Sequence, residues 1–135
     1  MEISKSAYDK LNATWLALKT TYGLLFVIAG ADKFLNLIVY WPQFLNPMLP
    51  SMFGVVPTYI IHAVGIVEII IGLTVLSQFT KLGGWIVAAW FMLIVVNLLG
   101  MWSYLDVAVR DTVLAIGAMA LACLTDVKRD IEQAR

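Results

Sequence analysis

Four long runs of apolar residues divide this chain. Each run has roughly the 20 residues that an α-helix needs to cross the hydrocarbon core of a bilayer. The runs lie approximately at residues 15–37, 58–79, 85–104 and 107–125. This pattern predicts an all-α polytopic membrane protein, a four-transmembrane-helix bundle that forms a single membrane domain over residues 1–135.

The connection between the first two predicted helices has its own character. Residues 38–57 are apolar and aromatic, yet they carry Pro42, Pro47, Pro50 and Pro57. Proline removes a backbone donor and cannot continue a regular helix. We expect this apolar, proline-containing loop to lie at the membrane interface, either as a lid over the mouth of the bundle or as a simple anchor for the helices.

The other two connections are short. Residues 79–84 join the second and third helices and include two glycines, and the third and fourth helices turn at Leu105–Asp106. Connections this short predict two tight antiparallel hairpins.

The composition agrees with an integral membrane protein. Hydrophobic residues make up 61% of the chain, and the mean hydropathy is +0.88. Nine basic residues balance nine acidic ones, so the formal net charge is zero. A chain without excess positive charge has no broad field to attract nucleic acid, and we expect the lipid bilayer, not nucleic acid, as its partner.

The basic residues also predict an orientation. With four spans, the two termini and the second connection share one side of the membrane. Most of the Lys and Arg residues fall on that side: Lys5, Lys10, Lys81, Lys128, Arg129 and Arg135. Basic residues concentrate in cytoplasmic segments, so both termini are predicted to be cytoplasmic. The N-terminal segment also lacks the short apolar core and small-residue cleavage site of a signal peptide.

Glu68 lies in the middle of the second apolar run. A carboxylate at the bilayer centre costs about 2.5–3.5 kcal/mol on insertion scales, so it needs a partner, a proton or a polar cavity. Two interpretations remain open: a carboxylate that carries protons or orients a ligand, and a structural ion pair. Arg110, near the outer end of the fourth span, is the partner we expect, unless its side chain reaches outward to the lipid headgroups.

Other polar side chains are expected at a similar depth. We predict a ligand or proton pocket in the outer half of the bundle, formed by Glu68, Arg110, Asp111, His62, Asn97 and Lys33. Lys33 and its neighbour Asp32 have an alternative role as the cap and anchor of the first helix. His62 is the sole histidine; without nearby nitrogen or sulfur ligands it predicts no metal site, and it serves either as a core residue or as a hydrogen-bond partner for a carbonyl group.

Small residues recur along one stripe of several spans. The first span carries Gly23 and Gly30, the second Gly65 and Gly72, and the fourth Gly117. Small side chains let helix backbones approach closely in lipid, where burial of apolar surface provides little driving force. These glycines are predicted to pack helices together. The stripe of the first span also carries Lys33 and that of the second Glu68, and we expect these two stripes to face each other.

Several classes of chemistry are excluded by the sequence. Cys123 is the only cysteine, so no intrachain disulfide and no paired-cysteine redox motif can form. No phosphate-binding loop, dinucleotide fingerprint or haem attachment motif occurs, and no covalently bound cofactor is expected. Electrons for any redox process would have to come from a ligand or a partner protein.

Three segments carry a resemblance to a known family. YGLLFVIAGADKFLNL at Tyr22–Leu37, GIVEIIIGL at Gly65–Leu73 and VRDTVLAIGAMALACL at Val109–Leu124 resemble the DoxX-like family of small bacterial four-helix membrane proteins. Some members of that family are similar to a membrane subunit of thiosulfate:quinone oxidoreductase, and others belong to membrane complexes linked to oxidative and thiol stress. The resemblance implies a location in the bacterial cytoplasmic (inner) membrane and an association with redox chemistry.

Three functions remain open at this point. The favoured one is a redox-associated, quinone-adjacent membrane subunit, with a quinone as the possible cofactor. The alternatives are a non-catalytic accessory or assembly subunit of a larger membrane complex and a small transporter or proton-conducting bundle. The sequence leaves open whether the chain is an enzyme and favours one that is not an enzyme on its own. A homo-oligomer or a complex with other membrane subunits is expected.

Overall fold

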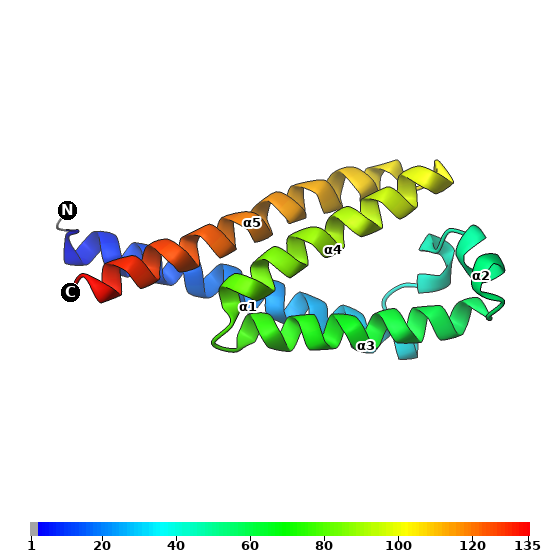
Figure 1. Cartoon of the computed structure of the whole chain (residues 1–135), viewed down its shortest axis with the longest axis horizontal. Coiled ribbons are helices and arrows are strands. Elements are labelled where there is room, and N and C mark those ends of the chain that lie inside the picture. Colours follow the sequence, from blue (N-terminus) through cyan, green and yellow to red (C-terminus); the bar gives the residue numbers. More distant parts are fainter. Residues whose placement is uncertain (1–2) are drawn as a thin grey trace.

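A computed structural model, described over residues 3–135, confirms an all-helical chain in which 84% of the residues are helical. In chain order the elements are α1 (Lys5–Leu35), the 3₁₀ helix η1 (Trp41–Phe44), α2 (Met48–Phe53), α3 (Pro57–Leu76), α4 (Thr80–Met101) and α5 (Leu105–Gln133) (Figure 1). Helices α1, α3, α4 and α5 are long and apolar enough to cross a membrane. The four-helix membrane bundle predicted from the apolar runs is therefore correct.

Two helices extend well beyond their predicted bounds. α1 begins at Lys5 rather than near residue 15, and α5 continues to Gln133 rather than ending near residue 125. Hydropathy finds only the apolar part of a helix, but charged residues also form helix when the end is capped. Here the Ser4 side chain accepts a hydrogen bond from the Ala7 N–H at 3.2 Å.

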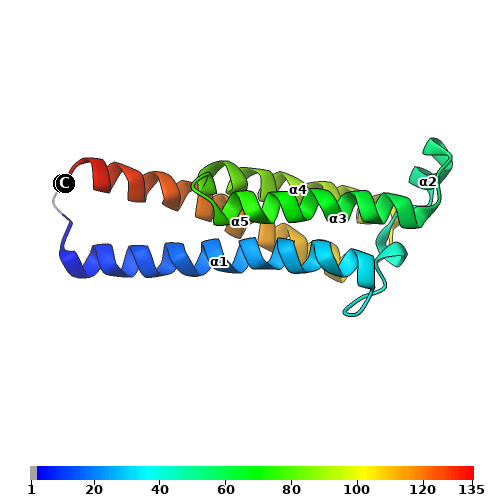
Figure 2. The same cartoon turned by 90° about the horizontal axis from the view of Figure 1, so that it is seen from below.

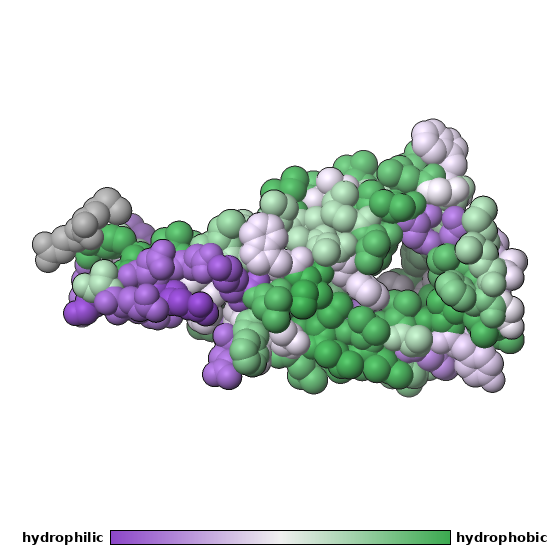
Figure 3. Space-filling model, in the orientation of Figure 1, coloured by the Kyte–Doolittle hydropathy of each residue, from purple (hydrophilic) through white to green (hydrophobic). Residues whose placement is uncertain are grey.

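The two extensions form a polar stalk, which we define as residues 5–14 of α1 and 126–133 of α5. They lie at the same end of the molecule, beyond the turn between α3 and α4 (Figures 1 and 2). The hydroxyl of Tyr8 donates to Glu132 Oε1 at 2.5 Å and joins the two helices there. The stalk is the hydrophilic end of the molecule, whereas the rest of the visible surface is mainly apolar (Figure 3).

The long helices pack as two pairs. The most extensive contacts join α1 to α3 and α4 to α5, whereas α3 meets α4, and α1 meets α5, over smaller areas. α3 and α4 are joined by residues 77–79 and diverge from that turn toward the opposite end (Figure 1). We call that opposite end the loop end, because residues 36–56, the loop segment, lie there.

Glycines allow the close packing of α1 on α3. A Cβ atom on Gly72 would lie 2.7 Å from the Gly23 carbonyl oxygen. Gly30 and Gly65 pack in the same way, seven residues nearer the loop end along each helix. Gly117 in α5 lies against the Tyr22 side chain, whose hydroxyl donates to the Leu114 carbonyl at 2.7 Å.

The placement of two glycines in the turn between the second and third spans was wrong. Gly83 and Gly84 are buried inside the first turns of α4. A Cβ on Gly84 would lie 3.1 Å from the Ala118 carbonyl oxygen, and one on Gly83 would lie 2.9 Å from the Val75 Cα. The pair therefore serves helix packing, because a glycine, which has no side chain, lets two helix backbones approach closely where they cross.

Aromatic and branched side chains fill the centre of the bundle. Phe26 and Phe91 meet edge to face with ring centroids 5.3 Å apart, a favourable arrangement for aromatic rings. Val75, Val87 and Leu121 have no exposed surface. Large apolar side chains such as Leu93 (62% exposed) point outward, which suits a bilayer environment.

The loop segment is more regular than predicted. It contains η1 and α2 despite its prolines. Pro42 lies at the start of η1, Pro50 in the first turn of α2, and Pro57 at the start of α3. A backbone N–H has no intrahelical partner in a first turn, so proline is tolerated there. Proline in this segment therefore begins helices instead of preventing them.

Candidate functional site

Glu68 in α3 pairs with Lys33 in α1. Lys33 Nζ lies 2.5 Å from Glu68 Oε2, and the two residues are only 5% and 4% exposed. The second carboxylate oxygen, Oε1, accepts a hydrogen bond from the Trp90 indole N–H of α4 at 3.0 Å. Oε2 is within ion-pair distance of the ammonium but has no hydrogen bond of good angle.

The direction of the two helices brings this pair together. Lys33 follows Gly30 by three residues and Glu68 follows Gly65 by three, so in antiparallel helices they lie on opposite sides of the glycine crossing. Side chains tilt toward the N-terminus of their own helix, so the two side chains point at each other past that crossing. A Cβ on Gly65 would lie 3.1 Å from the Lys33 Cβ, which shows how little room remains there.

An aromatic ring from the loop segment covers the ammonium group. Lys33 Nζ lies 3.5 Å from the centroid of the Trp41 ring, within the range of a cation–π contact. The Trp41 indole N–H in turn donates to Asp32 Oδ2 at 2.8 Å. The loop segment is therefore attached to α1 beside the ion pair.

Asp32 holds the start of the loop segment. Its carboxylate accepts hydrogen bonds from three successive backbone N–H groups, those of Leu37, Ile38 and Val39, at 2.8–3.3 Å. These groups follow the end of α1, where the chain turns at Asn36 in a left-handed conformation. Asp32 thus takes the anchoring role considered for the Asp32–Lys33 pair, whereas Lys33 joins the ion pair.

The predicted contact between Glu68 and Arg110 is wrong. Arg110 Nε and Nη2 lie 3.0 and 2.9 Å from Oδ1 of its neighbour Asp111. The Arg110 side chain is 64% exposed and that of Asp111 only 3%. Arginine can keep its head at the surface because its stem is long and apolar, and here it compensates a carboxylate that faces the bundle interior.

Asn97 in α4 binds the loop segment. Its Nδ2 donates to the Phe44 carbonyl at 2.6 Å, and its Oδ1 accepts from the Asn46 N–H at 3.0 Å. These two bonds link α4 to η1 and to the residues that follow it. Asn97 therefore fastens the loop segment to the second helix pair, as Asp32 fastens it to the first.

His62 stacks on Phe34, with ring centroids 4.7 Å apart and an angle of 22° between the rings. The side chains expected in one pocket are thus divided among separate places. Lys33 and Glu68 form the ion pair, Arg110 and Asp111 pair with each other on α5, Asn97 holds the loop, and His62 lies against Phe34.

Sequence reasoning missed two tryptophans of the site. Neither Trp41 nor Trp90 was among the residues predicted for the pocket. Trp90 lies deep in an apolar span, where an indole N–H needs an acceptor. That requirement pointed to a carboxylate at similar depth, and Glu68 is the one it meets.

The ion pair lies between the α3–α4 turn and the loop end, where Trp90 of α4 still reaches Glu68 of α3. The surface is hollowed between α3 and α4 beside the loop segment (Figure 3). Within the loop segment and the start of α3 there is a further cavity of about 400 Å³, lined by Tyr40, Pro42, Gln43, Leu45, Pro47, Pro50, Pro57 and Thr58. The loop end therefore offers both polar groups and open space.

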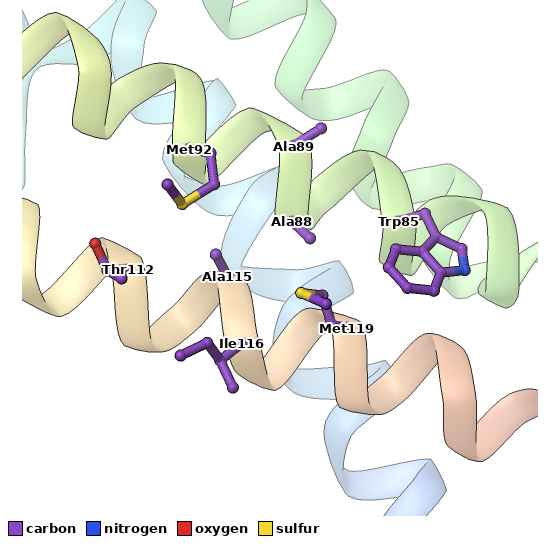
Figure 4. Close-up of a pocket in the computed structure, with 8 residues that line it drawn as sticks. All are labelled: Trp85, Ala88, Ala89, Met92, Thr112, Ala115, Ile116 and Met119. Atoms are coloured by element: carbon purple, nitrogen blue, oxygen red, sulfur yellow. The ribbon is translucent and has the colours of Figure 1, made fainter.

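A second depression is apolar. It has a volume of about 260 Å³ between α4 and α5 and is lined by Trp85, Ala88, Ala89, Met92, Thr112, Ala115, Ile116 and Met119 (Figure 4). Its one hydroxyl, that of Thr112, already donates to the Ala108 carbonyl at 2.8 Å. Apart from this hydroxyl and the Trp85 indole the lining is apolar, so the groove lacks the charged groups of the ion pair and is not the candidate site.

The cluster at the loop end can bind a small polar group in an apolar setting. Lys33 supplies a donor, Glu68 an acceptor, and the two indoles supply flat apolar surface. Within residues 3–135, no group of three or more His, Cys, Asp or Glu side chains is placed to hold a metal ion. Comparisons with protein-family models, with curated proteins and with solved structures gave no match.

Proposed function

We propose that this chain binds a lipid-soluble carbonyl compound of the quinone type and serves as a redox-associated membrane subunit similar to DoxX-like proteins. The observation that carries the proposal is the buried Lys33–Glu68 pair, flanked by Trp41 and Trp90. Ligand sites are mostly apolar, with a few polar groups that fix the orientation of the ligand. This cluster has that composition.

Each polar group has a role in this proposal. The Lys33 ammonium donates a hydrogen bond to a ring carbonyl oxygen of the oxidised ligand. The Glu68 carboxylate accepts one from a ring hydroxyl of the reduced ligand, because its Oε2 has no well-aligned hydrogen bond within the described structure. The Trp41 and Trp90 rings lie beside the pair and provide flat contact surfaces.

The ligand enters from the bilayer in this proposal. α3 and α4 diverge toward the loop end, and the surface is hollowed between them (Figure 3). A ligand with an isoprenoid tail can leave that tail in lipid while its ring approaches the pair. The loop segment, held by Asp32 and Asn97, closes the site on the side facing water.

The same proposal covers location and partners. The chain lies in the bacterial cytoplasmic membrane with both termini in the cytoplasm, and the site is in the outer half. It works as a homo-oligomer or beside other membrane subunits, which supply or accept the electrons.

Ligand-dependent stability tests the proposal. A bound ligand stabilises the folded state by RT ln(1 + [L]/Kd), about 2.7 kcal/mol at 100 times Kd. Addition of menadione or a short-chain ubiquinone analogue to the purified protein in detergent should raise its melting temperature. The double variant Lys33→Met/Glu68→Gln should lose that rise, since it removes both charged groups that would bind the ligand. The glutamine still offers the Trp90 indole N–H an acceptor, so the packing of α3 on α4 is kept. Lys81→Met, which removes a lysine at the other end, should keep it.

Two results would overturn the proposal. If the double variant binds as well as the natural chain, the ligand is elsewhere. If the natural chain shows no shift but co-purifies with a protein that the double variant fails to retain, an accessory subunit is the better description.

A further inference from the structure

Trp15 carries two ammonium groups over its ring at the stalk end, far from the ion pair. Lys19 Nζ lies 4.8 Å from the centroid of the indole ring, and Lys128 Nζ lies 4.6 Å from it. Lys19 belongs to α1 and Lys128 to α5. The indole N–H donates to Thr125 Oγ1 at 2.9 Å, which fixes the ring at the seam between the two helices.

The cluster lies at the depth where the apolar spans end. Thr125 precedes Asp126, which pairs at 2.8 Å with Lys81 in the first turn of α4. Lys19 lies about one helical turn before Gly23, which packs against Leu76 at the end of α3. The indole and its lysines are therefore level with the turn between α3 and α4, where the apolar surface gives way to the stalk (Figures 1 and 3).

Positive charge is in excess within this cluster. Lys128 pairs with Glu132, which also accepts from the Tyr8 hydroxyl. Lys19 forms no salt bridge with any residue in the described range 3–135. The cluster thus holds two positive charges, those of Lys19 and Lys128, and one negative charge, that of Glu132. An anion from outside the protein would balance the charge of Lys19.

We propose that Lys19, Lys128 and Trp15 bind the phosphate group of an anionic phospholipid at the seam of α1 and α5. Tryptophan prefers the headgroup region, and anionic lipids attract basic residues there. Leu16, the residue after Trp15 in α1, is half exposed and offers apolar surface to an acyl chain. The lipid is favoured over free phosphate because the site opens at the edge of the apolar surface.

This inference is independent of the quinone proposal and has its own test. The protein is purified in detergent with equal amounts of phosphatidylglycerol and phosphatidylcholine, and the retained lipids are counted by native mass spectrometry. Retention of phosphatidylglycerol over phosphatidylcholine should fall several-fold in Lys19→Gln and further in Lys19→Gln/Lys128→Gln. Lys19→Arg should keep the preference, because it keeps the charge.

Lys81→Gln is the matched control. It removes a positive charge at the same end, but from a lysine already paired with Asp126. It should leave the preference unchanged, and millimolar inorganic phosphate should not displace the lipid. An equal loss in Lys81→Gln would show general attraction and overturn the site. Unchanged retention in the double variant would also overturn it and leave the lysines as links between α1 and α5. Displacement by phosphate would overturn the assignment to a lipid.

Discussion

Gly30 in α1 and Gly65 in α3 pack backbone against backbone. A Cβ atom on Gly30 would lie 2.6 Å from the Gly65 carbonyl oxygen, and one on Gly65 would lie 2.7 Å from that of Gly30. Backbone atoms cannot rotate away as a side chain can. The close approach of α1 and α3, and with it the reach of Lys33 to Glu68, therefore depends on the absence of side chains at this crossing.

Substitution of Gly65 by alanine should destabilise the bundle. The added methyl group meets the Gly30 carbonyl and the Lys33 Cβ, so the helices must separate. Overpacking of this kind typically costs about 1–3 kcal/mol. Unfolding by titration with a denaturing detergent measures the loss. Gly100→Ala is a suitable control, because its nearest neighbour is the Asn46 amide nitrogen at 3.2 Å, and a side chain can move. Equal stability of the two variants would contradict the tight crossing.

The ion pair predicts a strong energetic coupling between Lys33 and Glu68. Removal of one partner leaves a buried charge and typically costs about 3–5 kcal/mol, whereas removal of both often costs much less. Lys33→Met and Glu68→Gln should therefore be far from additive when combined. Melting curves of the single and double variants give the coupling energy.

Arg110 provides the contrasting case. Because it pairs with Asp111 on its own helix, Arg110→Gln and Glu68→Gln should be additive within about 0.5 kcal/mol. Strong coupling between these two, with none between Lys33 and Glu68, would reverse the assignment of partners.

The fold followed from the sequence because each span is a run of apolar residues of membrane length. The ends of α1 and α5 did not, since Asp9 and Lys10 are helical but too polar for hydropathy to count. The short helices of the loop segment were also missed. Proline was taken as a break, although at Pro50 it occupies a first turn, where its missing N–H costs nothing.

The site was predicted only in part. Glu68 and Lys33 were both placed in the predicted pocket, because both are charged groups at membrane depth. Arg110 was expected as the partner of Glu68 because of its depth, and depth alone does not tell which side chain meets Glu68. The glycine spacing held the missing information: Lys33 and Glu68 each follow a packing glycine by three residues, and side chains on antiparallel helices tilt toward each other across such a crossing. No comparable signal linked His62 to Phe34.

Asn97 should control the mobility of the loop segment. Asn97→Asp keeps an acceptor for the Asn46 N–H but loses the donor to the Phe44 carbonyl. It also places a carboxylate oxygen against the Phe44 carbonyl oxygen. This partly buried hydrogen bond holds the loop segment. Leaving the Phe44 carbonyl without its donor costs about 1–3 kcal/mol, and the loss weakens the attachment of the loop segment. Hydrogen exchange of residues 41–49 should accelerate by at least tenfold, while exchange in the centre of α4 stays unchanged. Asn36→Asp, on the other side of the loop, is a control for added negative charge. Unaltered exchange in Asn97→Asp would show that the loop is held by its apolar contacts instead.

The orientation of the bundle can be tested with two cysteines. Six of the basic residues, Lys5, Lys10, Lys81, Lys128, Arg129 and Arg135, lie at the stalk end, which predicts that the stalk is cytoplasmic and the loop segment faces outward. Cys123 is first replaced by alanine, because it is exposed on α5. A cysteine at Ser51, an exposed residue of α2, should then react with a membrane-impermeant maleimide added to intact cells. A cysteine at Gln133 should react only after the membrane is opened. The charge rule makes this asymmetry the expected result, because translocation of the stalk would carry all six basic groups across the bilayer. The opposite labelling pattern would put the Lys33–Glu68 pair in the inner half and the Trp15 cluster in the outer leaflet.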